Sequence, residues 1–184
     1  MRIVYIIVKF LTLPGAMLHA FFEHMSCRSS KIIVDDARTV QANEMLAHID
    51  HELIKNKGAS FDICFIPFFL NLMLGFLSLT YGATAIYYFG RLSDAFAWIC
   101  LYLGISLLTN LFPQIEDVMM VKENFFVNNK KKISKILVAP FYAIFFVGSR
   151  IEKWGLTLIT SVVFSFAVPY ILGWFVPAIY RLLR

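Results

Sequence analysis

The chain has 184 residues, of which 59% are hydrophobic and only 16% are charged. Average soluble proteins are about 45–50% apolar and about 25% charged, so this composition argues against a water-soluble domain. Nineteen Phe, eight Tyr and three Trp are typical of helices that face lipid and carry aromatic belts at the membrane surfaces. The net charge of +5 includes a single lysine run at residues 130–132, which indicates contact with anionic lipid rather than with nucleic acid.

The apolar segments predict an all-α integral membrane protein, because a helix needs about 20 apolar residues to cross the hydrocarbon. In chain order they cover about residues 2–25, 63–89, 95–112, 133–148 and 156–183. The first is interrupted at Pro14-Gly15, and the fourth is short and contains Pro140, so it either crosses the membrane fully or re-enters the same side. We therefore expect one membrane domain over residues 1–184 with four to five transmembrane helices.

A polar segment at residues 26–61 is expected to form a small cytoplasmic insertion. Within it, residues 31–34 favour a short strand, and the apolar positions of residues 40–54 favour an amphipathic helix. Lys and Arg residues are concentrated in the polar segments, so five crossings would place the amino terminus outside and the carboxy terminus in the cytoplasm. A re-entrant fourth segment would invert the carboxy-terminal half of this topology.

Ionisable residues inside apolar segments are costly and therefore mark candidate functional sites. His19 and Glu23 lie four residues apart, within roughly 40° of each other on a helix, so they share one face. Such a pair forms a structural hydrogen bond, shares a proton or supplies two metal ligands. Asp117 follows the third apolar segment at a similar membrane depth, as a third ligand or simply as a solvated residue. His48, His51 and Glu52 also have a metal-like spacing, but we expect them on the solvated face of the amphipathic helix.

Two motifs of the chain resemble those of the site-2-protease-like membrane metallopeptidases, particularly the small prokaryotic relatives. Pro14-Gly15, with His19 four residues later, is similar to the start of the family's first core helix, and Asn110, Pro113 and Asp117 are similar to a later motif. The resemblance covers roughly residues 10–120. It implies the fold of an intramembrane protease in a prokaryotic plasma membrane. It also implies a zinc site for which His19, Glu23 and Asp117 are the candidate ligands.

The chain departs from the family at the residues that perform catalysis. Ala20 stands where the family has the glutamate that acts as general base, and Glu23 stands where it has a second histidine ligand. Loss of a positioned general base lowers a rate by about 10²–10⁴-fold. We therefore expect a non-proteolytic scaffold or regulatory subunit that binds a partner membrane protein or a second copy of itself.

Two alternative functions stay open. The first is a divergent zinc-dependent intramembrane protease that uses His19, Glu23 and Asp117 as ligands and Glu116 or His24 as the base. The second is a small transporter or channel component, in which the same ionisable residues form a path for ions or protons.

Overall fold

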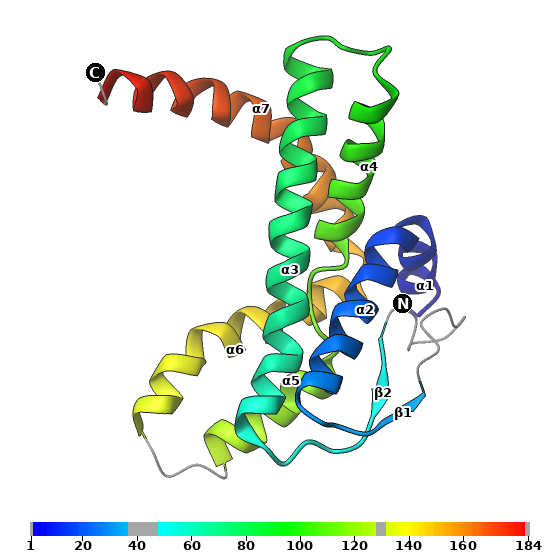
Figure 1. Ribbon diagram of the computed structural model, residues 1–184, viewed down its shortest axis with the longest axis vertical. Helices are drawn as coiled ribbons and strands as arrows, with labels where there is room; N and C mark the ends of the chain where they lie inside the picture. The colour runs from blue at the N-terminus through cyan, green and yellow to red at the C-terminus, as the bar shows by residue number, and fades with distance from the viewer. Residues whose placement is uncertain (1, 37–47, 128–131, 183–184) are drawn as a thin grey trace.

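The computed structural model describes residues 2–36, 48–127 and 132–182, with side chains described as far as Trp174. Within these ranges the chain is mostly helical, as the composition predicts. The elements in chain order are α1 (Arg2–Leu11), α2 (Leu13–Ser29), β1 (Val34–Asp36), β2 (Asp50–His51), α3 (Lys57–Ala83), the π-helix η1 (Thr84–Tyr88), α4 (Ala95–Thr109), α5 (Ile115–Lys122), the π-helix η2 (Glu123–Val127), α6 (Lys132–Lys153) and α7 (Leu156–Leu182). Figure 1 shows α3 running along the length of the molecule, with α2, α5 and the small sheet near its first residues.

The first apolar segment forms two helices, α1 and α2, that meet at 94°. The break comes at Thr12, two residues before Pro14, which lies in the first turn of α2, where a missing N–H group is tolerated. The outer face of α1 is apolar, with Ile3 and Ile7 exposed, whereas Lys9 is buried on its inner face. The expected interruption of this segment is therefore confirmed, and α1–α2 is either a broken span or a re-entrant pair.

α3 and α4 form the most closely packed pair of helices. Gly82 of α3 faces the backbone of Leu101 in α4, and Gly104 of α4 faces the backbone of Leu79 in α3. A Cβ atom at either glycine would overlap the facing backbone, so only glycine permits this approach. The small residues of these segments thus bring two helices together within the chain, as they commonly do in membranes.

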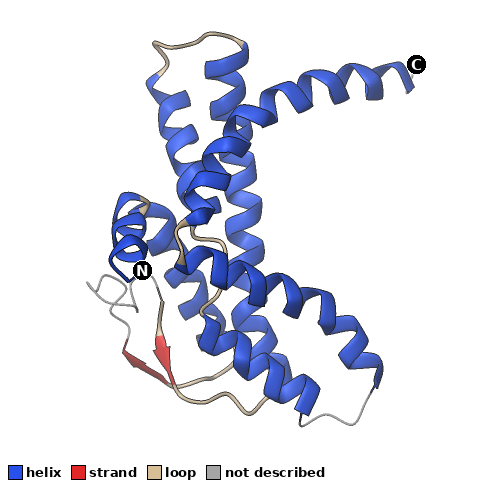
Figure 2. Cartoon of the chain, turned by 180° about the vertical axis from the view of Figure 1, so that it is seen from behind, coloured by secondary structure: helices blue, strands red, loops and turns tan. Residues whose placement is uncertain are grey.

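The last third of the described chain forms a second group of helices. α5 and η2 lead to α6, and aromatic side chains of α3, η2 and α6 pack between them, with Phe145 fully buried at the centre. Gly155 has φ +73°, which permits the turn from α6 into α7. Figure 2, seen from behind, shows α7 crossing in front of α3 and α4 before its last turns leave the bundle.

Three of the described helices are long and apolar enough to cross a membrane, and they correspond to the second, fourth and fifth predicted segments: Lys57–Tyr88, Lys132–Lys153 and Leu156–Trp174. The α1–α2 pair would make a fourth span if it crosses as one unit. α4 has 15 residues and is about 22 Å long, which is less than the roughly 30 Å of a hydrocarbon core. α6 is one continuous helix despite Pro140.

The polar segment differs from the expected amphipathic helix. Residues 40–47 lie outside the described part of the chain, and the prediction is wrong for residues 48–54, where Asp50–His51 forms β2. This strand pairs antiparallel with β1, and Val34 lies opposite His51. The extended backbone lets Ile49 N donate a hydrogen bond to Glu23 Oε1 at 3.3 Å. A tertiary contact with α2 therefore accompanies the extended conformation, and the strand expected at residues 31–34 forms at Val34–Asp36 instead.

Candidate metal centre

His19 and Glu23 of α2 form the base of a buried polar site. Their four-residue spacing places both side chains on the inner face of the helix, where they are 1% and 2% exposed. The amino-terminal end of α2 is held against α4 at Gly15, whose N–H donates a hydrogen bond of 2.7 Å to Ser106 Oγ. The Ser106 hydroxyl in turn donates to the Thr12 carbonyl at 2.8 Å. These bonds fix the position of α2 beside α4.

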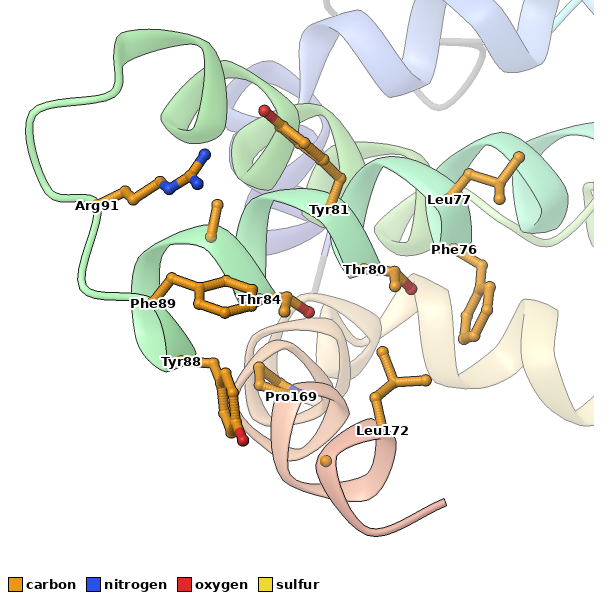
Figure 3. Close-up of a pocket in the computed structure, with 12 residues that line it drawn as sticks. Phe76, Leu77, Thr80, Tyr81, Thr84, Tyr88, Phe89, Arg91, Pro169 and Leu172 are labelled. Carbon is orange, nitrogen blue, oxygen red and sulfur yellow. The ribbon is translucent and has the colours of Figure 1, made fainter. Parts of the chain in front are cut away.

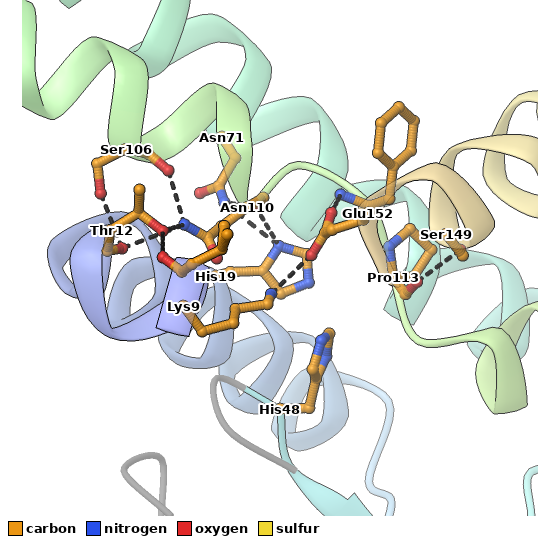
Figure 4. A network of polar contacts seen from close by, with 12 residues as sticks. Lys9, Thr12, His19, His48, Asn71, Ser106, Asn110, Pro113, Ser149 and Glu152 are labelled. Atoms are coloured by element: carbon orange, nitrogen blue, oxygen red, sulfur yellow. Dashed lines mark hydrogen bonds and ion pairs between the residues drawn. The ribbon is translucent and has the colours of Figure 1, made fainter. Parts of the chain in front are cut away.

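The orientation of the His19 ring is set by the end of α4. Its Nδ1 lies 3.0 Å from the carbonyl oxygen of Asn110, which can only accept a hydrogen bond, so Nδ1 carries the proton. The lone pair is then on Nε2, the atom that commonly binds a metal when Nδ1 is held by a carbonyl group. Asn71 Nδ2 donates to the same carbonyl oxygen at 2.6 Å. Figure 4 shows the His19 ring between Asn110 and His48.

Asn110 is the C-cap residue of α4, and its side chain joins this helix end to Thr12. Its amide Nδ2 donates to the Thr12 carbonyl, the Thr12 hydroxyl and the Ser106 carbonyl at 3.1, 2.8 and 2.8 Å. Three residues later, the Pro113 carbonyl accepts a hydrogen bond of 2.7 Å from Ser149 Oγ of α6. The irregular backbone between α4 and α5 therefore has partners on three neighbouring helices.

His48 closes the site from the segment that precedes β2. Its Nδ1 lies 3.2 Å from Glu23 Oε2, and its ring meets the His19 ring edge-on with centroids 5.1 Å apart. The residue is only 2% exposed. Burial and the nearby positive charge of Lys9 lower the pKa of His48 well below its ordinary value of 6.5. A neutral imidazole is the form that binds metal ions.

Asp117 reaches the site from the first turn of α5 and pairs with His51. His51 Nε2 lies 3.3 Å from Asp117 Oδ1, and Nδ1 donates to the Glu52 carbonyl oxygen at 3.0 Å. Burial alone would lower the pKa of His51, but the hydrogen bond and the charge of Asp117 outweigh it and raise the pKa to about 9. Without a metal ion, His51 is therefore positively charged at neutral pH.

A buried ion pair holds α1 and α6 beside this site. Lys9 Nζ lies 2.6 Å from Glu152 Oε1, although 143 residues separate the two along the chain. Glu152 Oε2 also accepts a hydrogen bond of 3.0 Å from Phe112 N, in the segment that joins α4 to α5. The pair thus ties the first helix, the sixth helix and the end of α4 together (Figure 4).

Within the described residues, two groups of side chains have ligand atoms close enough to hold a metal ion. The first contains His19, Glu23 and His48, and the second contains Glu23, His51 and Asp117. All ligand atoms of a group lie within 4.8 Å of one another. Glu23 belongs to both groups, so the five side chains form one cluster that could hold a metal.

The residues predicted from the sequence are thus found in one cluster, but not in one ligand group. Glu23 shares a group with His19 and another with Asp117. Glu116, considered as a base, lies at the surface 3.6 Å from Lys153, and His24 belongs to neither group. The expectation that His48 and His51 lie on a solvated helix face is wrong. The spacing of His48 and His51 was the only feature of the sequence that indicated a metal site at these residues. The contacts of His48 with Glu23 and of His51 with Asp117 depend on packing between distant segments.

Comparison of the chain with models of protein families, with curated proteins and with solved structures finds no match.

Proposed function

We propose that the chain is a membrane-embedded metalloprotein with a structural metal centre, and that it serves as a non-proteolytic scaffold or regulatory subunit for a partner membrane protein. The observation that carries this proposal is the sealed group of His19, Glu23 and His48, each no more than 2% exposed. Three ligands leave one tetrahedral position for a further donor, but the surrounding side chains close the group to bulk water and to a substrate.

The donor atoms of the group suit zinc. Two imidazoles and one carboxylate are common zinc ligands, and tetrahedral zinc bonds of about 2.0–2.1 Å place neighbouring ligand atoms roughly 3.3 Å apart. The distance between His48 Nδ1 and Glu23 Oε2 is 3.2 Å. A divalent cation would also balance the charge of Glu23, which is otherwise costly to bury, whereas Asp117 already has His51 as its partner. The proposed ligands are therefore His19, Glu23 and His48.

The same surroundings argue against peptide hydrolysis. Ala20 has no group that can accept a proton from metal-bound water. Asp117 is the other carboxylate of the described cluster, and it is already paired with His51. His48 packs against both His19 and Glu23, and all three side chains are buried. These contacts support a binding role rather than proteolysis.

The membrane placement belongs to the same proposal. α3, α6 and α7 would span a prokaryotic plasma membrane, with His19 of the metal centre beside Asn71, well inside the α3 span. The polar segment with β1 and β2 lies at the Lys57 end of α3 and would face the cytoplasm, on the side to which the positive-inside rule assigns it. A partner membrane protein would contact the lipid-facing helices.

The test is the thermal stability of the detergent-purified chain with zinc and with a chelator. A ligand that binds only the folded state at 1,000 times its Kd stabilises by about 4 kcal/mol, so chelation should lower the unfolding temperature by several degrees. His19→Ala should abolish this difference, whereas His24→Ala, the matched control in the same helix, should retain it. An unfolding temperature that is unaffected by zinc and chelator would contradict the proposal.

A divergent zinc protease is the second candidate, and the position of Asp117 next to Glu23 favours it. The resemblance implies His19, Glu23 and Asp117 as ligands, and Glu23 shares one ligand group with His19 and another with Asp117. If His48 merely covers a working centre, then His48→Ala should cleave a labelled transmembrane peptide in detergent, and Glu23→Gln in the same background should not. The structural proposal predicts no cleavage by His48→Ala and no cleavage by the unmodified chain.

A further inference from the structure

A cavity lies towards the carboxy-terminal end of α3, beyond Asn71, the residue of this helix that contacts His19. It has a volume of about 600 Å³ and lies between the last turns of α3, η1 and α7 (Figure 3). Its lining is almost entirely apolar, with Phe76 and Tyr88 on one side and Pro169 and Leu172 on the other. Cavities of about 300–1,000 Å³ accommodate small organic ligands, so this cavity has room for a hydrocarbon chain.

The length and direction of the cavity match one leaflet of a bilayer. Its lining extends along the helix from Phe76 to Tyr88, which is about 18 Å at 1.5 Å per residue. Half of a hydrocarbon core is about 15 Å thick. Tyr88, Phe89 and Arg91 lie together at one end, and aromatic and basic residues of this kind gather at membrane surfaces. The cavity therefore runs from the surface of a leaflet towards its middle.

Arg91 gives this end of the cavity a positive charge. Its guanidinium group lies 5.9 Å from the centre of the Phe89 ring, and no carboxylate of the described residues forms an ion pair with it. An arginine is well suited to phosphate, because its planar group donates two parallel hydrogen bonds. The charge thus favours an occupant with an anionic head and an apolar tail.

Two hydroxyl groups in the wall have hydrogen-bonding capacity that the described part of the chain leaves unused. Thr80 and Thr84 line the cavity, and their Oγ1 atoms are buried without a hydrogen-bond partner among the described residues. Leaving a buried hydroxyl unpaired costs free energy. Both oxygens are covered by protein atoms, so an occupant would accept a hydrogen bond from them only after rotation of the threonine side chains.

We propose that this cavity binds one anionic phospholipid, with its phosphate at Arg91 and an acyl chain between α3 and α7. The inference rests on the proposed membrane placement of these helices, but it does not depend on the metal centre. A neutral lipid would fill the apolar part and leave the charge of Arg91 unmatched.

The experiment is native mass spectrometry of the full chain released from vesicles of equal parts phosphatidylcholine and phosphatidylglycerol. Flotation of the vesicles first establishes that the chain is in the membrane. We expect one phosphatidylglycerol per chain, retained about tenfold over phosphatidylcholine. Arg91→Ala should reduce this preference about tenfold, whereas Arg150→Ala should leave it unchanged. Arg150 is the matched control because it is also exposed and lies over a phenylalanine ring, that of Phe146.

Thr84→Phe provides a second variant, since the larger side chain would occupy the cavity and should reduce retention of both lipids. A chain that does not float contradicts the membrane placement itself. A chain that floats but retains no lipid, or retains both lipids equally, overturns the proposed lipid site. Equal effects of Arg91→Ala and Arg150→Ala would also overturn it, as would retention of a second protein chain in place of the lipid.

Discussion

Replacement of Gly15 by alanine tests the contact that places His19 in the metal centre. A Cβ atom at Gly15 would lie 2.6 Å from Leu107 N and would overlap the Ser106 carbonyl still more closely. Ordinary van der Waals contacts of a Cβ begin at 3.4 Å, so α2 and α4 would have to separate. Because His19 is oriented by the Asn110 carbonyl of α4, this separation should also disturb the metal ligand.

The magnitude follows from two opposing terms. Alanine is favoured over glycine by about 0.5–1 kcal/mol inside a helix. Overpacking a tight contact typically costs about 1–3 kcal/mol, and here the obstructing atoms belong to backbone that cannot rotate away. Gly58 is the matched control, because it also lies in the first turn of a helix and its added Cβ would meet only Asn56 Oδ1 at 3.7 Å.

We therefore expect Gly15→Ala to be destabilised by about 1–3 kcal/mol and Gly58→Ala to be as stable as the unmodified chain or slightly more stable. Thermal unfolding in detergent, followed by the loss of monodisperse protein, measures the first effect. Competition with a zinc-binding dye measures the effect on the metal ligand: we expect a weaker zinc affinity in Gly15→Ala but not in Gly58→Ala. Equal stability of the two alanine variants would refute the packing argument.

Three further predictions concern the groups around the centre. Lys9→Met should destabilise the fold by about 3–5 kcal/mol in detergent unfolding, because it leaves Glu152 buried without its cation. The double variant Lys9→Met/Glu152→Gln should recover most of this stability. A double variant as unstable as Lys9→Met would contradict a stabilising role of the ion pair. Asn71→Leu should weaken zinc binding about tenfold in dye competition, because the Asn110 carbonyl that orients His19 loses a hydrogen-bond donor. An unchanged zinc affinity would show that Asn71 does not help to position His19. In chelator-treated protein the pKa of His51 is raised to about 9 in the folded state. The ion pair of His51 with Asp117 therefore stabilises the folded state fully below about pH 6.5, and this stabilisation is lost as the pH rises through about 9. His51→Ala should therefore lower the unfolding temperature at pH 7 but not at pH 10, and an equal effect at both would be inconsistent with this titration.

The features that could be predicted from the sequence follow from the helical period and from the lengths of the apolar segments. His19 and Glu23 lie four residues apart in one helix, so their shared face follows from local geometry. The second, fourth and fifth apolar segments appear as helices long enough to cross a membrane. Each of these features depends on residues that are close together in the chain.

The features that were missed depend on contacts between distant segments. His48 lies 25 residues from Glu23 in the sequence. The apolar positions around His48 fit the period of an amphipathic helix, although the chain is extended there and makes tertiary contacts instead. Lys9 was seen only as an interruption, because its partner Glu152 is 143 residues away. The predicted segment ended at residue 112, whereas α4 ends at Thr109 with Asn110 as its C-cap, and the hydrogen bonds of Asn110 to Thr12 are not visible in hydropathy. Local patterns contain no information about such pairings.

The most direct test of the metal centre is the metal content of the purified, folded chain, compared with that of His48→Ala and His24→Ala. The account predicts about one zinc ion per chain in the unmodified protein and in His24→Ala, and its loss in His48→Ala. Folded protein without metal, or a His48→Ala variant that keeps its full zinc content, would contradict the assignment of His19, Glu23 and His48 as the ligands.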